Sequence, residues 1–235
     1  ENFTVARVKR SMFKQSYLGL VYTDRSTQNP DNDSTGLNQS LYGADLDLKT
    51  SEFMGDKNLY LQAFFVTHTA PKNSTDLNLS DLSTRGLRIT YPNDIIRTHV
   101  SYREFGEMYS PAVGFSRRNG FKRLQPSFSY HPRPKRYEFI RQIEFGIGYE
   151  YMADFNDKML KKETTITPFN VRFESQDEIG IKLVNLVEYL DRPFTIYRDI
   201  TIPVKEYRSD EWQFKIETSE RRMVSTEFQY QTGDF

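Results

Sequence analysis

Pairs of carboxylates are the first residues in this sequence whose spacing suits catalysis. Glycoside hydrolysis uses two carboxyl groups roughly 5–9 Å apart. Asp45 and Asp47 lie on one face of a predicted strand, where side chains two residues apart are separated by about 6.6–7 Å. Any strand with a polar face produces this spacing, and Glu144 and Glu150 are an equally ordinary pair. We therefore expect no catalytic residues and no enzyme, with a glycoside-acting hydrolase as the alternative.

Metal and cofactor sites are not expected either. The three histidines, His68, His99 and His131, are far apart in the sequence and lack the spacing of metal ligands. The chain contains no cysteine, which excludes a disulfide framework, a thiolate zinc site and a cysteine nucleophile. The sequence also lacks a nucleophile elbow, a phosphate-binding loop and a dinucleotide fingerprint. We expect no cofactors.

Basic side chains are concentrated in the middle of the chain. Residues 85–141 contain 12 Lys or Arg and 4 Asp or Glu, which gives a net charge of +8 within a chain of zero net charge. Arginine binds phosphate and carboxylate groups through two parallel hydrogen bonds. One interpretation is a basic patch, on the wall of a barrel lumen or on a loop, that binds an anionic glycan or a lipopolysaccharide phosphate. The alternative is a set of Arg–Glu ion pairs that hold strands together. The candidate ligand-binding residues are Arg88, Arg97, Arg103, Arg117, Arg118, Lys122 and Arg123.

The composition indicates β structure with one solvent-exposed face. Thirty-two basic and 32 acidic residues balance, which argues against a general nucleic-acid-binding protein. Hydrophobic residues make up 37% of the chain and aromatic residues 14%, while no apolar run is long enough for a transmembrane helix. The strand-like sequence that follows Glu1 leads us to expect an internal piece of a longer protein.

Alternation with a period of two residues, typical of strands, recurs along the whole chain. In Phe139–Met152, for example, Ile143, Phe145 and Ile147 alternate with Glu144 and other polar or small residues. The predicted strands number about thirteen: 2–10, 14–25, 39–51, 57–69, 83–92, 95–105, 124–132, 137–153, 160–175, 178–190, 195–208, 211–221 and 223–231.

The predicted connections alternate between short and long as far as residue 136. Residues 11–13, 52–56, 93–94 and 132–136 form short connections, whereas residues 26–38, 70–82 and 106–123 form long ones. After Asp154 most connections are predicted to be brief. This alternation is typical of up-and-down outer-membrane barrels. Pro111, Gly114 and Gly120 predict that the loop over 106–123 is folded and tucked inward.

Two all-β architectures fit this pattern. A soluble sandwich or barrel buries its apolar face, whereas a transmembrane barrel turns that face toward lipid. Long strands and aromatic residues near strand ends, such as Tyr22, Tyr151 and Trp212, favour the membrane. We predict that residues 1–235 form part of one antiparallel up-and-down transmembrane β-barrel, incomplete in this chain, without a second domain.

Four ordered motifs resemble the C-terminal barrel region of a family of Bacteroidota outer-membrane proteins that carry an N-terminal domain similar to family 9 carbohydrate-binding modules. The motifs are Arg7-Val-Lys-Arg10, Ser16-Tyr-Leu-Gly-Leu-Val-Tyr-Thr-Asp-Arg25, Tyr42-Gly-Ala-Asp-Leu46, and Tyr109-Ser-Pro-Ala-Val-Gly-Phe-Ser-Arg-Arg118 followed by Asn119-Gly120. The similarity covers the whole chain, but the carbohydrate-binding-like domain and the closing strands of the family are not in this sequence.

The resemblance implies a membrane protein of the Gram-negative cell outer membrane that serves as anchor or channel for glycan binding or uptake. The implied partners are outer-membrane lipid and lipopolysaccharide, glycan, and other outer-membrane complex subunits, without nucleic acid. Two alternatives stay open: a structural subunit of an uptake, secretion or assembly complex, and a soluble all-β carbohydrate-active enzyme.

Overall fold

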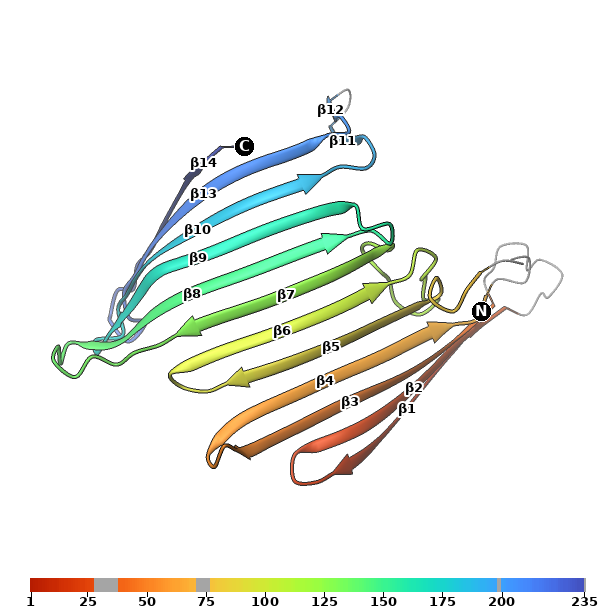
Figure 1. The fold of residues 1–235 in the computed structure, drawn as a ribbon, viewed down its shortest axis with the longest axis horizontal. Helices are drawn as coiled ribbons and strands as arrows, with labels where there is room; N and C mark the ends of the chain where they lie inside the picture. Colours follow the sequence, from red (N-terminus) through yellow and green to blue (C-terminus); the bar gives the residue numbers. More distant parts are fainter. Residues whose placement is uncertain (28–37, 71–76, 198–199, 235) are drawn as a thin grey trace. The chain divides into compact units, whose positions relative to one another are not determined.

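The computed structural model describes residues 1–27, 38–70, 77–197 and 200–234. These residues form fourteen β-strands and no helix (Figure 1). The strands are β1 (Asn2–Met12), β2 (Ser16–Ser26), β3 (Gln39–Phe53), β4 (Lys57–His68), β5 (Ser83–Pro92), β6 (Ile96–Phe105), β7 (Phe121–Tyr130), β8 (Ile140–Ala153), β9 (Met159–Phe173), β10 (Glu178–Tyr189), β11 (Phe194–Tyr197), β12 (Ile200–Ile202), β13 (Glu206–Glu217) and β14 (Glu227–Gly233).

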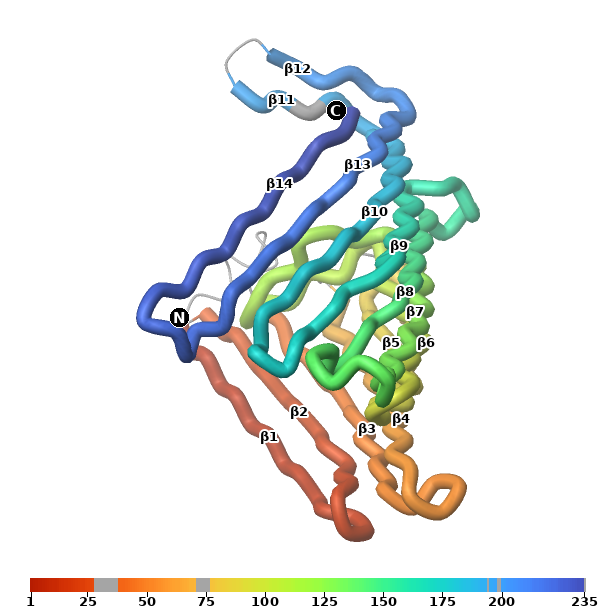
Figure 2. Tube along the Cα trace, turned by 90° about the vertical axis from the view of Figure 1, so that its left-hand side faces the viewer, coloured from red at the N-terminus to blue at the C-terminus, as the bar shows by residue number. Residues whose placement is uncertain are grey.

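Twelve of these strands form one sheet in sequence order. The order runs from β1 to β10 and then through β13 to β14, so that β1 and β14 each have one neighbour. The prediction of an all-β, antiparallel, up-and-down chain is confirmed by this order. The strands β11 and β12 pair with each other in a separate two-stranded sheet, which lies beyond the ends of β10 and β13 (Figure 2).

The chain divides into two compact units, whose boundary crosses β5, β6 and β7. The first unit comprises residues 1–90, 101–123 and 154–156, and the second comprises residues 91–100, 124–153 and 157–235. Each unit is described separately below.

Strand register in the first unit separates an apolar face from a polar face. Successive residues of a strand point to opposite sides of the sheet. Rows of paired residues across neighbouring strands therefore alternate between the apolar face and the polar face. One row contains Leu18, Leu46, Ala63 and Leu87 on β2 to β5. The neighbouring row contains Tyr17, Asp47, Gln62 and Arg88 on the same strands.

The second unit has the same two-faced construction. An apolar row contains Ile147, Ile166, Leu183 and Trp212 on β8, β9, β10 and β13. On the polar face, Lys161 of β9 lies between two carboxylates, 3.1 Å from Glu150 and 2.8 Å from Glu163.

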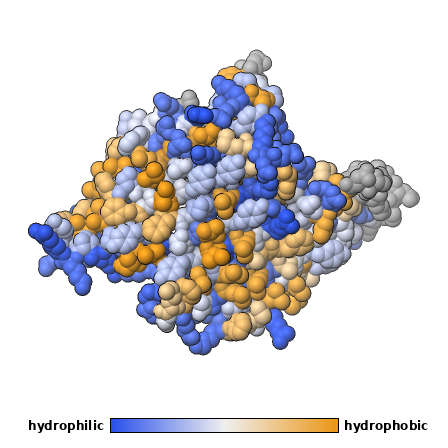
Figure 3. Space-filling model, in the orientation of Figure 1, coloured by the Kyte–Doolittle hydropathy of each residue, from blue (hydrophilic) through white to orange (hydrophobic). Residues whose placement is uncertain are grey.

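Most large apolar side chains remain at the surface. Leu20, Ile147 and Trp212, for example, are 55%, 51% and 48% exposed. Broad hydrophobic patches are visible on the side of the molecule shown in Figure 3. Among the described residues, no large side chain is fully buried. The buried apolar residues are Leu41, Leu82, Tyr109 and Phe121 in the first unit and Met152, Ala153 and Leu160 in the second.

The connections follow the predicted short and long pattern in part. Three-residue turns join β1 to β2, β3 to β4 and β5 to β6. In the second of these turns, Gly55 has a φ of +101°, a conformation that favours glycine. The predicted connection over 132–136 is too short, because the chain between Tyr130 and Ile140 lies outside strands and contains two prolines, which cannot donate to a ladder. Residues 28–37 and 71–76, within the predicted loops over 26–38 and 70–82, lie outside the described residues.

The predicted single strand over 195–208 is wrong. Its described residues belong to β11, β12 and the start of β13, and Pro203 lies between the last two. Proline lacks the backbone N–H that a continuous ladder needs, so the strand is interrupted there. The connection between β10 and β13 is consequently long, contrary to the expectation of brief connections after Asp154.

Candidate functional site

Three of the predicted basic residues come together on the polar face of the first unit. Arg88 lies on β5, Arg103 on β6 and Arg123 on β7. The guanidinium groups of Arg88 and Arg123 are close enough to repel that of Arg103. Nε of Arg88 donates a hydrogen bond to Oγ1 of Thr90 at 3.2 Å. Within the described part of the chain, Arg103 makes neither a hydrogen bond nor an ion pair.

A glycine allows Arg103 to lie across the neighbouring strand. A Cβ atom at Gly86 would be 3.2 Å from Cγ of Arg103 and 2.5 Å from Cε1 of Phe64. Gly86, Arg88 and Arg103 are among the residues that line a hollow of about 230 Å³. A larger residue at position 86 would press on the ring of Phe64 first and on Arg103 second.

Two aspartates also line this hollow. Asp45 pairs with Arg7, with 2.6 Å between Oδ1 and Nη2, and Oδ2 of Asp47 lies 3.0 Å from Nζ of Lys49. Oδ2 of Asp47 also accepts a hydrogen bond from Gln62 at 3.3 Å. Asp47 is 5% exposed, and its Oδ1 is buried without a hydrogen-bond partner among the described residues. Each of the two aspartates is thus paired with a cation of its own.

The remaining predicted basic residues do not join this cluster. Arg97 belongs to the second unit, where its Nε donates to the carbonyl of Asn93 at 3.3 Å. Arg117 and Arg118 lie in the loop between β6 and β7, and Lys122 follows at the start of β7. The ion-pair alternative holds for basic residues outside the predicted set, since Arg85 pairs with Glu104, and Arg133 pairs with Asp94 at 2.7 Å.

The loop over 106–120 is folded and held by side chains from β3 and β4. His68, which is 5% exposed, contacts both sides of the loop's first turn: its Nε2 lies 3.2 Å from the carbonyl of Met108 and accepts from the amide of Ser110 at 3.1 Å. Gln39 lies 2.8 Å from Nδ1 of His68, and its Oε1 accepts from the amide of Ala112 at 2.6 Å. The sequence pattern singles out neither His68 nor Gln39 for this role, although both lie at strand ends that adjoin long connections.

Aromatic rings close the base of the same loop. Phe105 and Phe121, the last residue of β6 and the first of β7, stack with ring centroids 5.0 Å apart. Tyr109 packs against both Phe105 and His68, and its carbonyl accepts from Asn119 at 2.5 Å. Burial raises the pKa of the Tyr109 phenol, so the ring stays neutral.

The other two histidines are held by serine hydroxyls in the second unit. Nδ1 of His99 lies 2.6 Å from Oγ of Ser127, and Nε2 of His131 lies 2.8 Å from Oγ of Ser129. Burial lowers the pKa of His131; Glu144 and Asp94 oppose this shift, whereas Arg97 and Arg172 add to it. In the described part of the chain, no group of three or more His, Asp or Glu side chains is arranged to hold a metal ion.

Three of the four carboxylates considered for catalysis are engaged in ion pairs. Asp45 and Asp47 bind the cations named above, and Oε1 of Glu150 lies 3.1 Å from Nζ of Lys161. Glu144 lines a separate hollow of about 220 Å³ in the second unit, together with Glu178, Lys182 and Lys215. Glu178 is itself paired with Arg172 at 2.9 Å.

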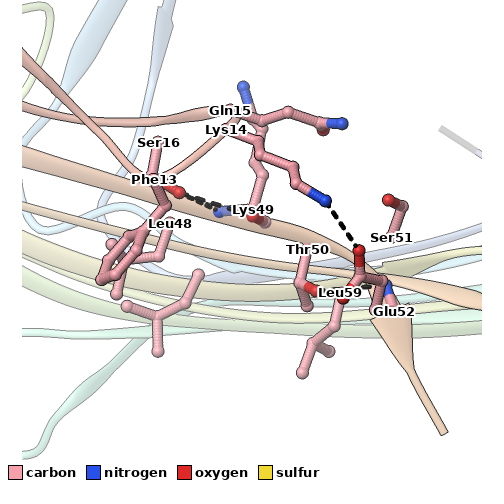
Figure 4. Close-up of a pocket in the computed structure, with 11 residues that line it drawn as sticks. Phe13, Lys14, Gln15, Ser16, Leu48, Lys49, Thr50, Ser51, Glu52 and Leu59 are labelled. Carbon is pink, nitrogen blue, oxygen red and sulfur yellow. Dashed lines mark hydrogen bonds and ion pairs between the residues drawn. The ribbon is translucent and has the colours of Figure 1, made fainter. Parts of the chain in front are cut away.

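A hollow of about 620 Å³ lies at the turn between β1 and β2. Phe13, Leu48 and Leu59 lie together on one side of it, whereas Lys14 reaches over to Glu52 at 3.1 Å (Figure 4). Lys49 is fixed nearby through its amide, which donates to Oγ of Ser16 at 2.9 Å. A hollow with apolar side chains on one side and polar side chains at its rim suits the binding of an aliphatic chain better than catalysis.

The chain was compared with protein-family models, curated proteins and solved structures, and no match was found. A search of the described residues for a helix long and apolar enough to cross a membrane found none. The residues thus define an all-β protein whose antiparallel, up-and-down sheet has one apolar and one polar face. Its function must be argued from these residues.

Proposed function

We propose that this chain forms part of the wall of a transmembrane β-barrel in a Gram-negative outer membrane. In this proposal the apolar face contacts lipid and the polar face lines a lumen. The observation that carries the proposal is the exposed apolar face, which recurs on neighbouring strands of both units. A soluble sandwich would bury such a face in its core.

Two features add support to the proposal. The strands of the twelve-stranded sheet other than β14 contain 10–15 residues, enough for a tilted strand to cross the hydrocarbon layer. The polar face carries ion pairs between strands, such as Arg7 of β1 with Asp45 of β3 and Arg172 of β9 with Glu178 of β10. This combination of an apolar outer band and a charged inner wall is typical of outer-membrane barrels.

The biological role that we propose is that of an anchor or channel in glycan binding or uptake. This role rests on the resemblance to Bacteroidota outer-membrane proteins, whose barrels follow a carbohydrate-binding-like domain. The barrel itself contributes attachment and a polar path rather than catalysis in this proposal, consistent with carboxylates that are engaged in ion pairs.

The sole tryptophan gives a direct test of the proposal. Trp212 lies on the apolar face of β13, and Gln213 lies on the polar face directly after it. After reconstitution of the full-length protein in vesicles, we expect brominated lipid to quench the fluorescence of Trp212 strongly and acrylamide to quench it weakly.

The matched control moves the reporter by one residue. In the double variant Trp212→Phe with Gln213→Trp, the indole faces the polar side, so acrylamide should quench it and brominated lipid should not. Folding is checked independently by the faster migration of unboiled protein on a denaturing gel. Lack of lipid quenching of Trp212 in protein that shows this migration would contradict a lipid-facing surface and favour burial against a partner subunit. A protein that stays soluble without detergent would contradict membrane insertion altogether.

A further inference from the structure

Two aromatic rings lie on the polar face of the first unit. Phe64 of β4 stands in a register row with Asp45 and Gly86. Tyr17 of β2 stands in the next polar row, where it is paired with Asp47. Both aromatic residues are half-buried, and both line the hollow of about 230 Å³. The hollow therefore presents aromatic surface among charged and amide side chains.

Two glycines make room for this hollow. Asp45 and Phe64 are paired across β3 and β4. A Cβ atom at Gly19 of β2 would lie 2.5 Å from Oδ1 of Asp45, and one at Gly86 of β5 would lie 2.5 Å from Cε1 of Phe64. Because β2 and β5 flank the pair on opposite sides, the carboxylate and the ring lean away from each other. The space between them is part of the hollow that both side chains line.

Hydrogen-bond donors and acceptors alternate around the hollow. Asp45 and Asp47 provide carboxylate oxygens. Gln62 provides an amide with both a donor and an acceptor, and Arg88 provides guanidinium N–H groups. Asp47 is 5% exposed, and the described residues offer no donor to its Oδ1. A buried acceptor without a donor is unfavourable, so a ligand that donates a hydrogen bond to Asp47 gains binding free energy.

The charges around the hollow favour an uncharged ligand. Each of the two aspartates already has a cation of the chain beside it, so neither requires one from a ligand. An anion in the hollow would lie next to two carboxylates, which would repel it. A neutral molecule with several hydroxyl groups donates to the carboxylates and accepts from the amide and the guanidinium group.

We infer that this hollow is a binding site for a neutral sugar ring. Each hydroxyl group of a pyranose both donates and accepts, and the C–H groups of the ring pack against aromatic faces such as those of Tyr17 and Phe64. Small-molecule sites combine aromatic walls with a few convergent polar groups in this way, and those for drug-sized ligands measure about 300–1,000 Å³. A hollow of about 230 Å³ therefore suits a single sugar ring.

The inference rests on the proposed function, because it names a sugar as the ligand of the polar face that the proposal turns toward a lumen. The experiment titrates the full-length protein, in the detergent or buffer that keeps it folded, with methyl glycosides of glucose, galactose and mannose. Saturation-transfer NMR measures the affinity for each glycoside. Acetate and glycine are the charged probes, an anion and a ligand with one charge of each sign. We expect saturable binding of at least one glycoside, with weaker binding of both charged probes.

The decisive variant is Phe64→Leu, which removes the ring and keeps an apolar side chain beside Gly86. It should weaken glycoside binding about three- to tenfold. Phe65→Leu is the matched control, since it removes the same ring from the next position of β4, which lies on the opposite face. This control should change the affinity by about 1.5-fold at most. Phe64→Tyr keeps a ring and should bind within about twofold of the unchanged protein.

The inference is overturned if no glycoside binds saturably, if Phe64→Leu binds as tightly as the unchanged protein, or if acetate or glycine binds more tightly than every glycoside. A sugar bound elsewhere in the full-length protein would not respond to Phe64→Leu. Circular dichroism of the β-sheet shows whether each variant is folded.

Failure of the sugar site and failure of the barrel are distinguishable. Glycoside binding that depends on Phe64 in a protein that stays soluble without detergent would contradict the barrel and support the sugar site. Lipid quenching of Trp212 without glycoside binding would support the barrel and overturn the sugar site.

Discussion

The contacts of His68 predict how firmly the loop over 106–120 is closed. A neutral imidazole donates from one nitrogen and accepts at the other. It can accept from Gln39 and donate to the carbonyl of Met108, or donate to the carbonyl of Thr69 and accept from the amide of Ser110. Either tautomer gives two hydrogen bonds, and in both of them one bond reaches the loop.

His68→Ala removes both bonds and leaves the amide of Gln39 without its partner. Only one of the two bonds joins His68 to the loop, so at about 0.5–1.5 kcal/mol for one net hydrogen bond the free energy of opening the loop should fall by about 0.5–1.5 kcal/mol. Amide exchange through local opening should then be about 2- to 12-fold faster at Ser110 and Ala112, the two loop amides that bond to His68 and Gln39.

Hydrogen exchange followed by NMR or mass spectrometry measures this change directly. Arg117→Ala is the control within the same loop, since Arg117 is exposed, and it should leave both amides protected. Exchange at Ser110 and Ala112 that changes by less than twofold in His68→Ala would refute the idea that this histidine closes the loop.

Two further predictions concern single side chains on the polar face and at a strand end. Burial holds the pKa of His131 below its usual value, so the unfolded chain takes up a proton first as the pH falls. Stability should therefore decrease from about pH 6.5 downward and level off below the pKa of the folded state. In His131→Asn this part of the pH profile of the melting temperature should be flatter, and an unchanged profile would contradict the assignment. A Cβ atom at Gly19 would lie 2.5 Å from Oδ1 of Asp45, which pairs with Arg7. Gly19→Ala should lower the free energy of unfolding in urea by about 1–3 kcal/mol, whereas Gly148→Ala, where the nearest atom is at 3.8 Å, should not lower it; equal losses would exclude crowding as the cause.

Strand identity could be predicted from the sequence because it depends on local alternation. The segment 83–92 was predicted with the same bounds as β5, and 178–190 differs from β10 by one residue. The prediction fails where prolines interrupt the alternating pattern of a strand. Pro203 separates two strands inside the predicted segment 195–208, and Pro132 and Pro134 lengthen the connection before β8.

The partners of charged residues could not be predicted, because they depend on register between strands distant in sequence. Arg85 and Arg88 are three residues apart, so alternation alone places them on opposite faces. The sequence does not indicate that Glu104 faces Arg85, or that Gln62 stands between Arg88 and Asp47. The same limit applies to Gln39 and His68, which reach the loop at Ala112 and Ser110 from 73 and 42 residues away.

The position of the arginine cluster relative to the loop follows from these long-range contacts. His68 and Gln39 fix the loop that joins β6 to β7, and the stacked Phe105 and Phe121 close its base. Arg103 and Arg123 are each two residues from those rings, so the contacts that hold the loop also keep two like charges adjacent.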